Sequence, residues 1–184
     1  MKIALGSDHR GYFAKEKLKP LLEQLGYEVS DFGTDSTKAF DYPDVAYPVA
    51  KAVAGRQADR AILLCGTGLG VSISANKVAG IRAALCHDEL TAQMSRQHND
   101  ANVLCLPADL IGEALMRRIV EVWLETPFEG GRHSRRVQKI AEIERNNHTE
   151  QESCGCCGPI EETPPKEDVE PVKPVEIRRQ GTAT

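Results

Sequence analysis

The sequence lacks any apolar stretch long enough for membrane insertion. No run of apolar residues approaches the roughly 20 that are needed to cross a bilayer. The apolar start is interrupted at once by Asp8, His9 and Arg10, which argues against a secretory signal. We therefore expect a cytoplasmic protein without a membrane partner.

An excess of basic charge is also missing. The net charge is −4, and it belongs to the segment from Glu150 onward, which has eight acidic and four basic residues. Residues 1–149 are neutral as a whole. Because binding to nucleic-acid phosphates calls for a basic surface, nucleic acid is not an expected partner.

The six cysteines lack the spacing of a secreted disulfide framework. Cys65, Cys86 and Cys105 stand in or beside apolar runs, and the other three crowd into CGCC at 154–157. This pattern favours reduced thiols in a cytoplasm. Three neighbouring thiols could bind a soft metal or react with oxidants, but His148 is the nearest fourth ligand and is distant, so we assign no metal.

Short apolar runs alternate with helical periodicity along the chain. Wholly apolar strands separated by helices are typical of a parallel sheet covered on both faces. With right-handed crossovers this predicts an α/β, Rossmann-like doubly wound domain of about five strands over residues 1–147. The expected strands are 1–6, 27–32, 61–65, 81–86 and 103–106, and the expected helices are 12–25, 44–53, the segment from the 66–70 turn to about 78, 88–97, 111–124 and 134–145.

The composition changes beyond about residue 147. Five of the ten prolines lie there, and the segment has no leucine, methionine or aromatic residue. Such a segment buries too little apolar surface to offset the loss of chain entropy on folding. Residues 148–184 are therefore expected to form a disordered acidic tail.

A cysteine followed by glycines, CGTGLG at 65–70, joins the third expected strand to a helix. A helix start offers unpaired N–H groups and the positive end of the helix dipole, and a thiol there is more readily deprotonated. The turn could thus supply both a base, Cys65, and an oxyanion site, as proton abstraction beside a carbonyl requires. A buried cysteine that merely ends a strand is an equal alternative. GxGxxG and GK[ST] are absent, so the turn is neither a dinucleotide fingerprint nor a P-loop.

Polar side chains also follow the first strand. Ligands of doubly wound sheets bind at the carboxyl ends of the strands, so Asp8 and His9 should converge with Cys65 on one edge. A carboxylate and an imidazole there can hold hydroxyl groups and a phosphate. Alternatively, Asp8 caps the helix that begins nearby.

Two more sets of candidate site residues lie later in the chain. His98, beside Asn99, could act as a general acid, or could simply be a helix C-terminal residue that favours the dipole. Arg132 and Arg136 are four residues apart, so a helix would place them on one face, where they suit a phosphate dianion. The alternative is a solvated basic helix start.

Taken together, these pieces resemble the ribose-5-phosphate isomerase B family, which includes allose-6-phosphate and galactose-6-phosphate isomerases. The resemblance covers residues 1 to about 146. It rests on GSDHRGY, DYPDVAYPVA, CGTGLGVSISANKVAGIRAAL, HNDANVLCLP and FEGGRHSRRV in this order. It implies interconversion of D-ribose 5-phosphate and D-ribulose 5-phosphate through a cis-enediolate, without metal or organic cofactor. It also implies a homodimer or homotetramer whose active sites are shared between subunits.

The resemblance implies a role for each matching residue. Cys65 would move the proton between carbon 2 and carbon 1, and His98 would protonate the ring oxygen to open the furanose. Asp8 would bind or deprotonate sugar hydroxyls. Thr67 and the backbone of Gly66, Gly68 and Gly70 would stabilise the enediolate. Asn99 would orient the substrate, and Tyr42 would line the sugar pocket. The phosphate would be bound by His9, Arg132 and Arg136.

Two positions distinguish this chain within the family pattern. Cys65 together with Val71 matches the members that use a thiolate base rather than a glutamate. Asp109 stands where many members carry a phosphate-binding arginine, and Arg10 is a candidate to compensate. Asp109 therefore leaves open an isomerase of a six-carbon sugar phosphate or of an unphosphorylated sugar. A non-catalytic sugar-phosphate-binding protein is the remaining alternative.

Overall fold

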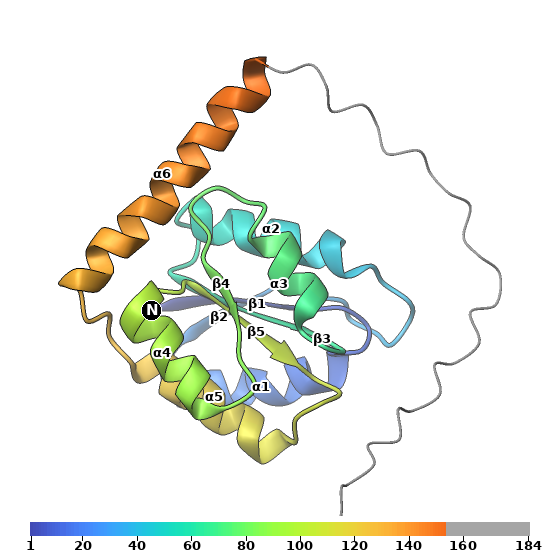
Figure 1. The fold of residues 1–184 in the computed structure, drawn as a ribbon. Coiled ribbons are helices and arrows are strands. Elements are labelled where there is room, and N and C mark those ends of the chain that lie inside the picture. Colours follow the sequence, from blue (N-terminus) through green and yellow to red (C-terminus); the bar gives the residue numbers. More distant parts are fainter. Residues whose placement is uncertain (154–184) are drawn as a thin grey trace, which may run out of the picture.

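A five-stranded parallel sheet forms the central layer of the structure, a computed structural model that describes residues 1–153, with side chains for residues 1–147 (Figure 1). The expected tail from residue 148 and its CGCC motif thus lie outside the residues whose side chains are described. The strands are β1 (Lys2–Ser7), β2 (Glu28–Asp31), β3 (Arg60–Cys65), β4 (Ala83–Leu85) and β5 (Val103–Pro107). The helices are α1 (Tyr12–Gln24), α2 (Tyr42–Ala54), α3 (Leu69–Ala75), α4 (Glu89–Asn99), α5 (Glu113–Glu125) and α6 (Arg132–Ser153).

The strand order is β2-β1-β3-β5-β4, with every neighbouring pair parallel. The chain leaves β1 toward β2 on one side and returns to β3 on the other side. The ends of β1 and β3 therefore meet at a topological switch point, where open α/β sheets bind their ligands. The Rossmann-like fold predicted from the sequence is confirmed.

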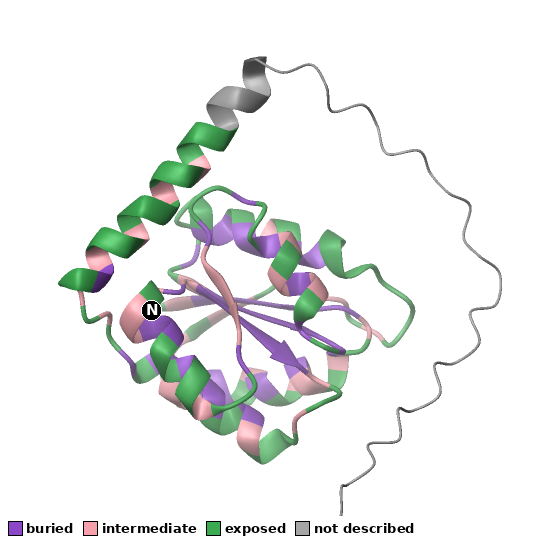
Figure 2. Ribbon diagram, viewed as in Figure 1, coloured by how far each residue is buried: buried purple, intermediate pink, exposed green. Residues whose placement is uncertain are grey.

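Alternate residues of each strand enter two separate cores, because successive side chains of a strand point to opposite faces. On β3, Ile62 and Leu64 pack against α1, α4 and α5, whereas Leu63 and Cys65 pack against α2 and α3. Figure 2 shows the central strands, β1, β3 and β5, buried between helices with exposed outer surfaces, whereas β4 is half-buried. Cys65 is consequently fixed by the strand that carries it and by the packing of α2 and α3.

Several helices and strands begin one or two residues away from their predicted starts, α2 and β4 among them. Helix α2 begins at Tyr42 rather than 44, since Pro43 in its first turn needs no hydrogen-bonded N–H. Strand β4 begins only at Ala83. Side chains accept from the backbone N–H groups at its start: that of Arg82 donates to Oδ1 of Asn102 at 2.8 Å, and that of Ala83 donates to Oδ1 of Asn76 at 2.9 Å.

Helix α6 is longer than predicted and extends away from the body of the domain (Figure 1). Both carboxylate oxygens of Glu144 accept from the N–H of Gly80, at 3.0 and 2.9 Å. Ile140 and Ile143 of this helix are exposed. Among residues 1–153, no helix is both long and apolar enough to span a bilayer.

Candidate active site

Cys65 ends β3 with its sulfur held by the turn that follows. The N–H of Gly68 donates to Sγ of Cys65 at 3.1 Å. Gly68 has φ +72°, a conformation that glycine adopts without steric cost. A Cβ at this position would collide with Leu85 and approach the backbone carbon of Leu106 at 3.1 Å. The turn therefore needs glycine both for its conformation and for its close packing.

The strand-end residues surround a cavity of about 330 Å³. Asp8 from the end of β1 and Cys65 from the end of β3 both line it, as the sheet topology predicts. The remaining lining residues are Arg10, Tyr42, Gly66, Thr67, Gly70 and Asp109. Of the groups expected to meet at this edge of the sheet, Asp8, Cys65, Gly66 and Gly70 line the pocket.

Asp8 is buried near the N-terminus of α1, but it is not the residue that caps this helix. Its Oδ1 accepts from the N–H groups of Arg10 and Gly11 at 2.9 and 3.0 Å, in the turn before the helix. Gly11 occupies the N-cap position, and no side chain caps there. Asp8 is therefore held rigidly by the backbone at the edge of the pocket.

Asp109 reaches this pocket and is paired there with Arg10. Nε of Arg10 lies 2.6 Å from Oδ2 of Asp109, and this hydrogen bond raises the pKa of Arg10. The pair crosses the backbone at Gly66, where an added Cβ would stand 2.5 Å from Oδ2 of Asp109. On another side of the pocket, a Cβ on Gly70 would meet the ring of Tyr42 at 2.7 Å. Because Gly66 and Gly70 have no side chains, the pocket stays open between the ion pair of Arg10 and Asp109 on one side and the ring of Tyr42 on the other.

His9 adjoins the pocket without lining it. Its Nδ1 lies 3.1 Å from the carbonyl oxygen of Phe40 and 3.2 Å from its backbone nitrogen. This contact ties the end of β1 to the loop that precedes α2.

His98 and Asn99 lie at the opposite end of the sheet from Cys65 within one chain. They end α4 and precede β5, whose first residue, Val103, pairs with Ala61 at the beginning of β3. Cys65 is four residues further along β3, which is about 13 Å at the usual rise of a strand. The structure therefore separates these residues from the pocket that contains Cys65.

His98 is stacked on a histidine that the sequence analysis did not single out, His133. The two imidazole rings are 4.2 Å apart and parallel within 1°. Oε2 of Glu129 lies 4.0 Å from Nε2 of His98 and 3.5 Å from Nε2 of His133. Burial, and then the neighbouring His98 and Arg132, lower the pKa of His133. The separation of four residues between Glu129 and His133 was the available signal for this cluster.

The same cluster is where a metal ion could be considered, because its three ligand atoms lie within 4.8 Å of one another. An imidazole directs its lone pair in the plane of its ring. The parallel, stacked rings of His98 and His133 therefore cannot both point at one ion in this arrangement. Nε2 of His133 also lies 3.3 Å from Nε of Arg132, a cation that disfavours a second one.

Arg132 and Arg136 begin α6, and both are exposed. The expected spacing on one helix is present, and Arg132 adjoins the cluster of His98, Glu129 and His133. The predicted site residues thus form two groups in one chain. One group surrounds Cys65, and the other gathers where α4 ends and α6 begins.

A buried thiol beside a rigid carboxylate, at the switch point of a parallel sheet, defines an α/β enzyme suited to moving a proton. The chain belongs to the ribose/galactose isomerase family, whose model matches residues 3–140. It is 49% identical over 147 residues to ribose-5-phosphate isomerase B of Escherichia coli, a match that covers 80% of this chain and 99% of the relative.

Solved structures with similar folds and sequences support the same family. Ribose-5-phosphate isomerase B of Clostridium thermocellum is 52% identical with a TM-score of 0.79, over 80% of this chain and 99% of that one. A ribose 5-phosphate isomerase of Thermotoga maritima is also 52% identical, with a TM-score of 0.75, over 77% and 97% of the two chains. The family, fold and enzyme class predicted from the sequence are confirmed.

Proposed function

We propose that this chain interconverts D-ribose 5-phosphate and D-ribulose 5-phosphate, in the cytoplasm and as a step of pentose phosphate metabolism. The names of relatives about half identical in sequence support this substrate pair. The observation that carries the proposal is the pocket that joins Cys65, Asp8 and the glycine-rich turn. A base, a polar group for hydroxyls and backbone donors are the parts that an enediolate mechanism requires.

The reaction moves two protons and no other atoms. The thiolate of Cys65 takes the proton from carbon 2, and the electron pair forms the double bond to carbon 1 while charge develops on the carbonyl oxygen. N–H groups of the turn and the Thr67 hydroxyl stabilise this charge, with Gly68 holding the sulfur. The hydroxyl proton on oxygen 2 passes to oxygen 1, with Asp8 beside it. Cys65 then returns its proton to carbon 1, which gives the ketose.

The second group of residues completes the site from another copy of the chain. The Cys65 pocket contains two carboxylates, Asp8 and Asp109, and one guanidinium, Arg10, so it carries net negative charge. A phosphate dianion needs further cations, which Arg132 and Arg136 supply when a second copy brings them to the pocket. His98 of the same copy opens the sugar ring. These charges support a homodimer with shared sites.

A second candidate substrate class is favoured by Asp109. Its carboxylate lies inside the pocket beside Gly66, where it repels a nearby phosphate and pairs with Arg10, the cation that could otherwise attract the phosphate. An unphosphorylated sugar, or a six-carbon sugar phosphate whose phosphate sits farther away, would avoid this repulsion.

The deciding experiment compares kcat/KM for ribose 5-phosphate, allose 6-phosphate, galactose 6-phosphate and ribose, in the wild type and in Asp109→Asn. We expect ribose 5-phosphate to be preferred, and the variant to lower its KM about threefold to tenfold, since roughly 1 kcal/mol of repulsion is removed. The rate on ribose should not change. Preference for another sugar would establish the second candidate, and no turnover of any of the four would favour a binding protein.

A further inference from the structure

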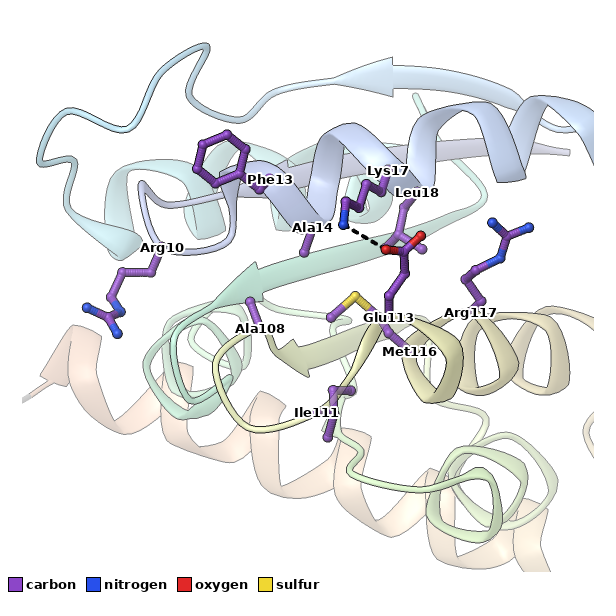
Figure 3. Close-up of a pocket in the computed structure, with 10 residues that line it drawn as sticks. All are labelled: Arg10, Phe13, Ala14, Lys17, Leu18, Ala108, Ile111, Glu113, Met116 and Arg117. Carbon is purple, nitrogen blue, oxygen red and sulfur yellow. Dashed lines mark hydrogen bonds and ion pairs between the residues drawn. The ribbon is translucent and has the colours of Figure 1, made fainter. Parts of the chain in front are cut away.

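A second cavity, of about 280 Å³, opens between α1 and α5 (Figure 3). Most of its lining is apolar and comes from the two helices and from the segment between β5 and α5. One of these side chains, Phe13, is 66% exposed although it is a large aromatic group. The apolar lining residues are Phe13, Ala14, Leu18, Ala108, Ile111 and Met116.

The rim of this cavity carries more positive than negative charge. Figure 3 shows Lys17 of α1 and Glu113 of α5 meeting across it, with Nζ and Oε2 2.7 Å apart. The hydrogen bond from Lys17 lowers the pKa of Glu113, so these two charges cancel. Arg117 also lines the cavity and acts electrostatically on Glu113, so Lys17 and Arg117 share one carboxylate and one net positive charge remains. An apolar cavity with a net positive charge at its rim suits a ligand that is apolar and anionic.

The cavity adjoins the Cys65 pocket at one shared residue, Arg10. Arg10 lines both spaces, Ala108 lines the second cavity, and Asp109 lines the pocket. The N–H of Ala108 donates to the carbonyl of Cys65 at 2.9 Å, and that of Asp109 donates to the carbonyl of Gly66 at 3.0 Å. A ligand that displaces Arg10 or Ala108 therefore acts directly on the segment that carries the base.

We propose that the cavity between α1 and α5 is a binding site for a small organic anion with an apolar body, and that its occupancy is transmitted to Cys65. The site goes beyond the proposed isomerase activity and does not depend on it.

The probe for this site is 8-anilinonaphthalene-1-sulfonate, which has an aromatic body and one negative charge. Its binding is followed by titration of the probe's fluorescence. Ala14→Trp should fill the cavity and abolish saturable binding. Arg117→Gln should weaken binding about fivefold, the effect of roughly 1 kcal/mol. Arg118→Gln, one residue along the same helix and outside the lining, is the matched control and should leave the affinity unchanged.

The effect of cavity occupancy on Cys65 is measured by the alkylation rate of Cys65. This assay does not require catalytic turnover. The probe should change this rate about fivefold in the wild type and leave it unchanged in Ala14→Trp. Absence of saturable binding, or unaltered binding in Ala14→Trp, would overturn the site, and an unchanged alkylation rate would overturn the coupling. A changed oligomeric state of Ala14→Trp in sedimentation would instead identify a contact between copies and also overturn the site. A wild type inactive on ribose 5-phosphate counts only against the proposed function.

Discussion

The amide of Gly68 donates a hydrogen bond to Sγ of Cys65 at 3.1 Å, which fixes the sulfur at the edge of the pocket. The contact depends on a left-handed residue at the start of α3, packed directly against Leu85 and the end of β5. The position of the base is thus set by the backbone conformation of one glycine.

Gly68→Ala should cost about 3 kcal/mol of unfolding free energy, from the left-handed conformation and the overpacking together. It should also lower kcat at least roughly tenfold, because relief of the clash would move the N–H that donates to the sulfur. Gly26→Ala is the control, since Gly26 has φ +82° with no atom within 4 Å of an added Cβ. It should cost about 1 kcal/mol and leave kcat unchanged. Urea unfolding and steady-state kinetics provide both values, and equal effects of the two substitutions would contradict this account of the turn.

The cysteines of the folded domain should differ in their reaction with iodoacetamide near neutral pH. Burial raises the pKa of Cys86 to about 11 and raises that of Cys105 further, so both should be inert. Cys65 lines the pocket, and we expect it to react at least about tenfold faster, with ribose 5-phosphate slowing the reaction. Peptide mapping by mass spectrometry follows each cysteine separately. Modification of Cys86 before Cys65 would refute the prediction.

Asp31 should make stability depend on pH in acid. Burial alone would raise its pKa, but hydrogen bonds from Lys15, Lys19 and the N–H of Gly33 hold the pKa below its usual range. The unfolded chain therefore takes up the proton first as the pH falls. The stabilisation is complete above about pH 4 and is lost as the pH falls through the folded pKa.

Asp31→Asn should therefore cost about 2 kcal/mol at pH 7, since Lys15 is only 2% exposed and loses the nearer of its two carboxylate partners, at 2.5 Å, keeping Glu16 at 3.1 Å. The cost should shrink below about pH 4. Glu28→Gln, in the same strand, removes only an exposed pair with Lys2 and should cost less than about 0.5 kcal/mol. Urea unfolding from pH 3 to pH 7 measures these values, and a cost of Asp31→Asn that stays constant with pH would count against the prediction.

Sharing of the active site between copies predicts complementation. Cys65→Ala and His98→Asn should each be nearly inactive alone. Mixed dimers would contain one site with both residues intact, so unfolding and refolding an equal mixture should restore roughly a quarter of wild-type activity. If both residues act within one chain, the mixture will remain inactive.

The fold was predictable because its strands are short, wholly apolar and separated by helical periodicity. Strand β3 lies within one residue of its predicted limits. The topology rule then predicted that Asp8 and Cys65 meet, since both follow strands at the switch point. The end of α6 was missed: the predicted helix ended at 145, but the helix continues to Ser153.

Other parts of the site depend on contacts that no local pattern encodes. Asp109 reaches Gly66 because the turn after β5 hydrogen-bonds to the turn after β3, and its pairing with Arg10 joins residues 99 positions apart. The stack of His98 on His133 arises where α6 begins beside the end of α4. Such relationships follow from tertiary packing and not from periodicity or spacing.

The most direct test of the account is the conversion of ribose 5-phosphate to ribulose 5-phosphate by the wild type and by Cys65→Ala, with circular dichroism to verify that the variant is folded. We expect turnover by the wild type and a loss of about 10³-fold or more in kcat for the variant, the contribution expected of a general base. A folded Cys65→Ala variant that retains activity within about tenfold of the wild type would contradict the assignment of Cys65 as the base.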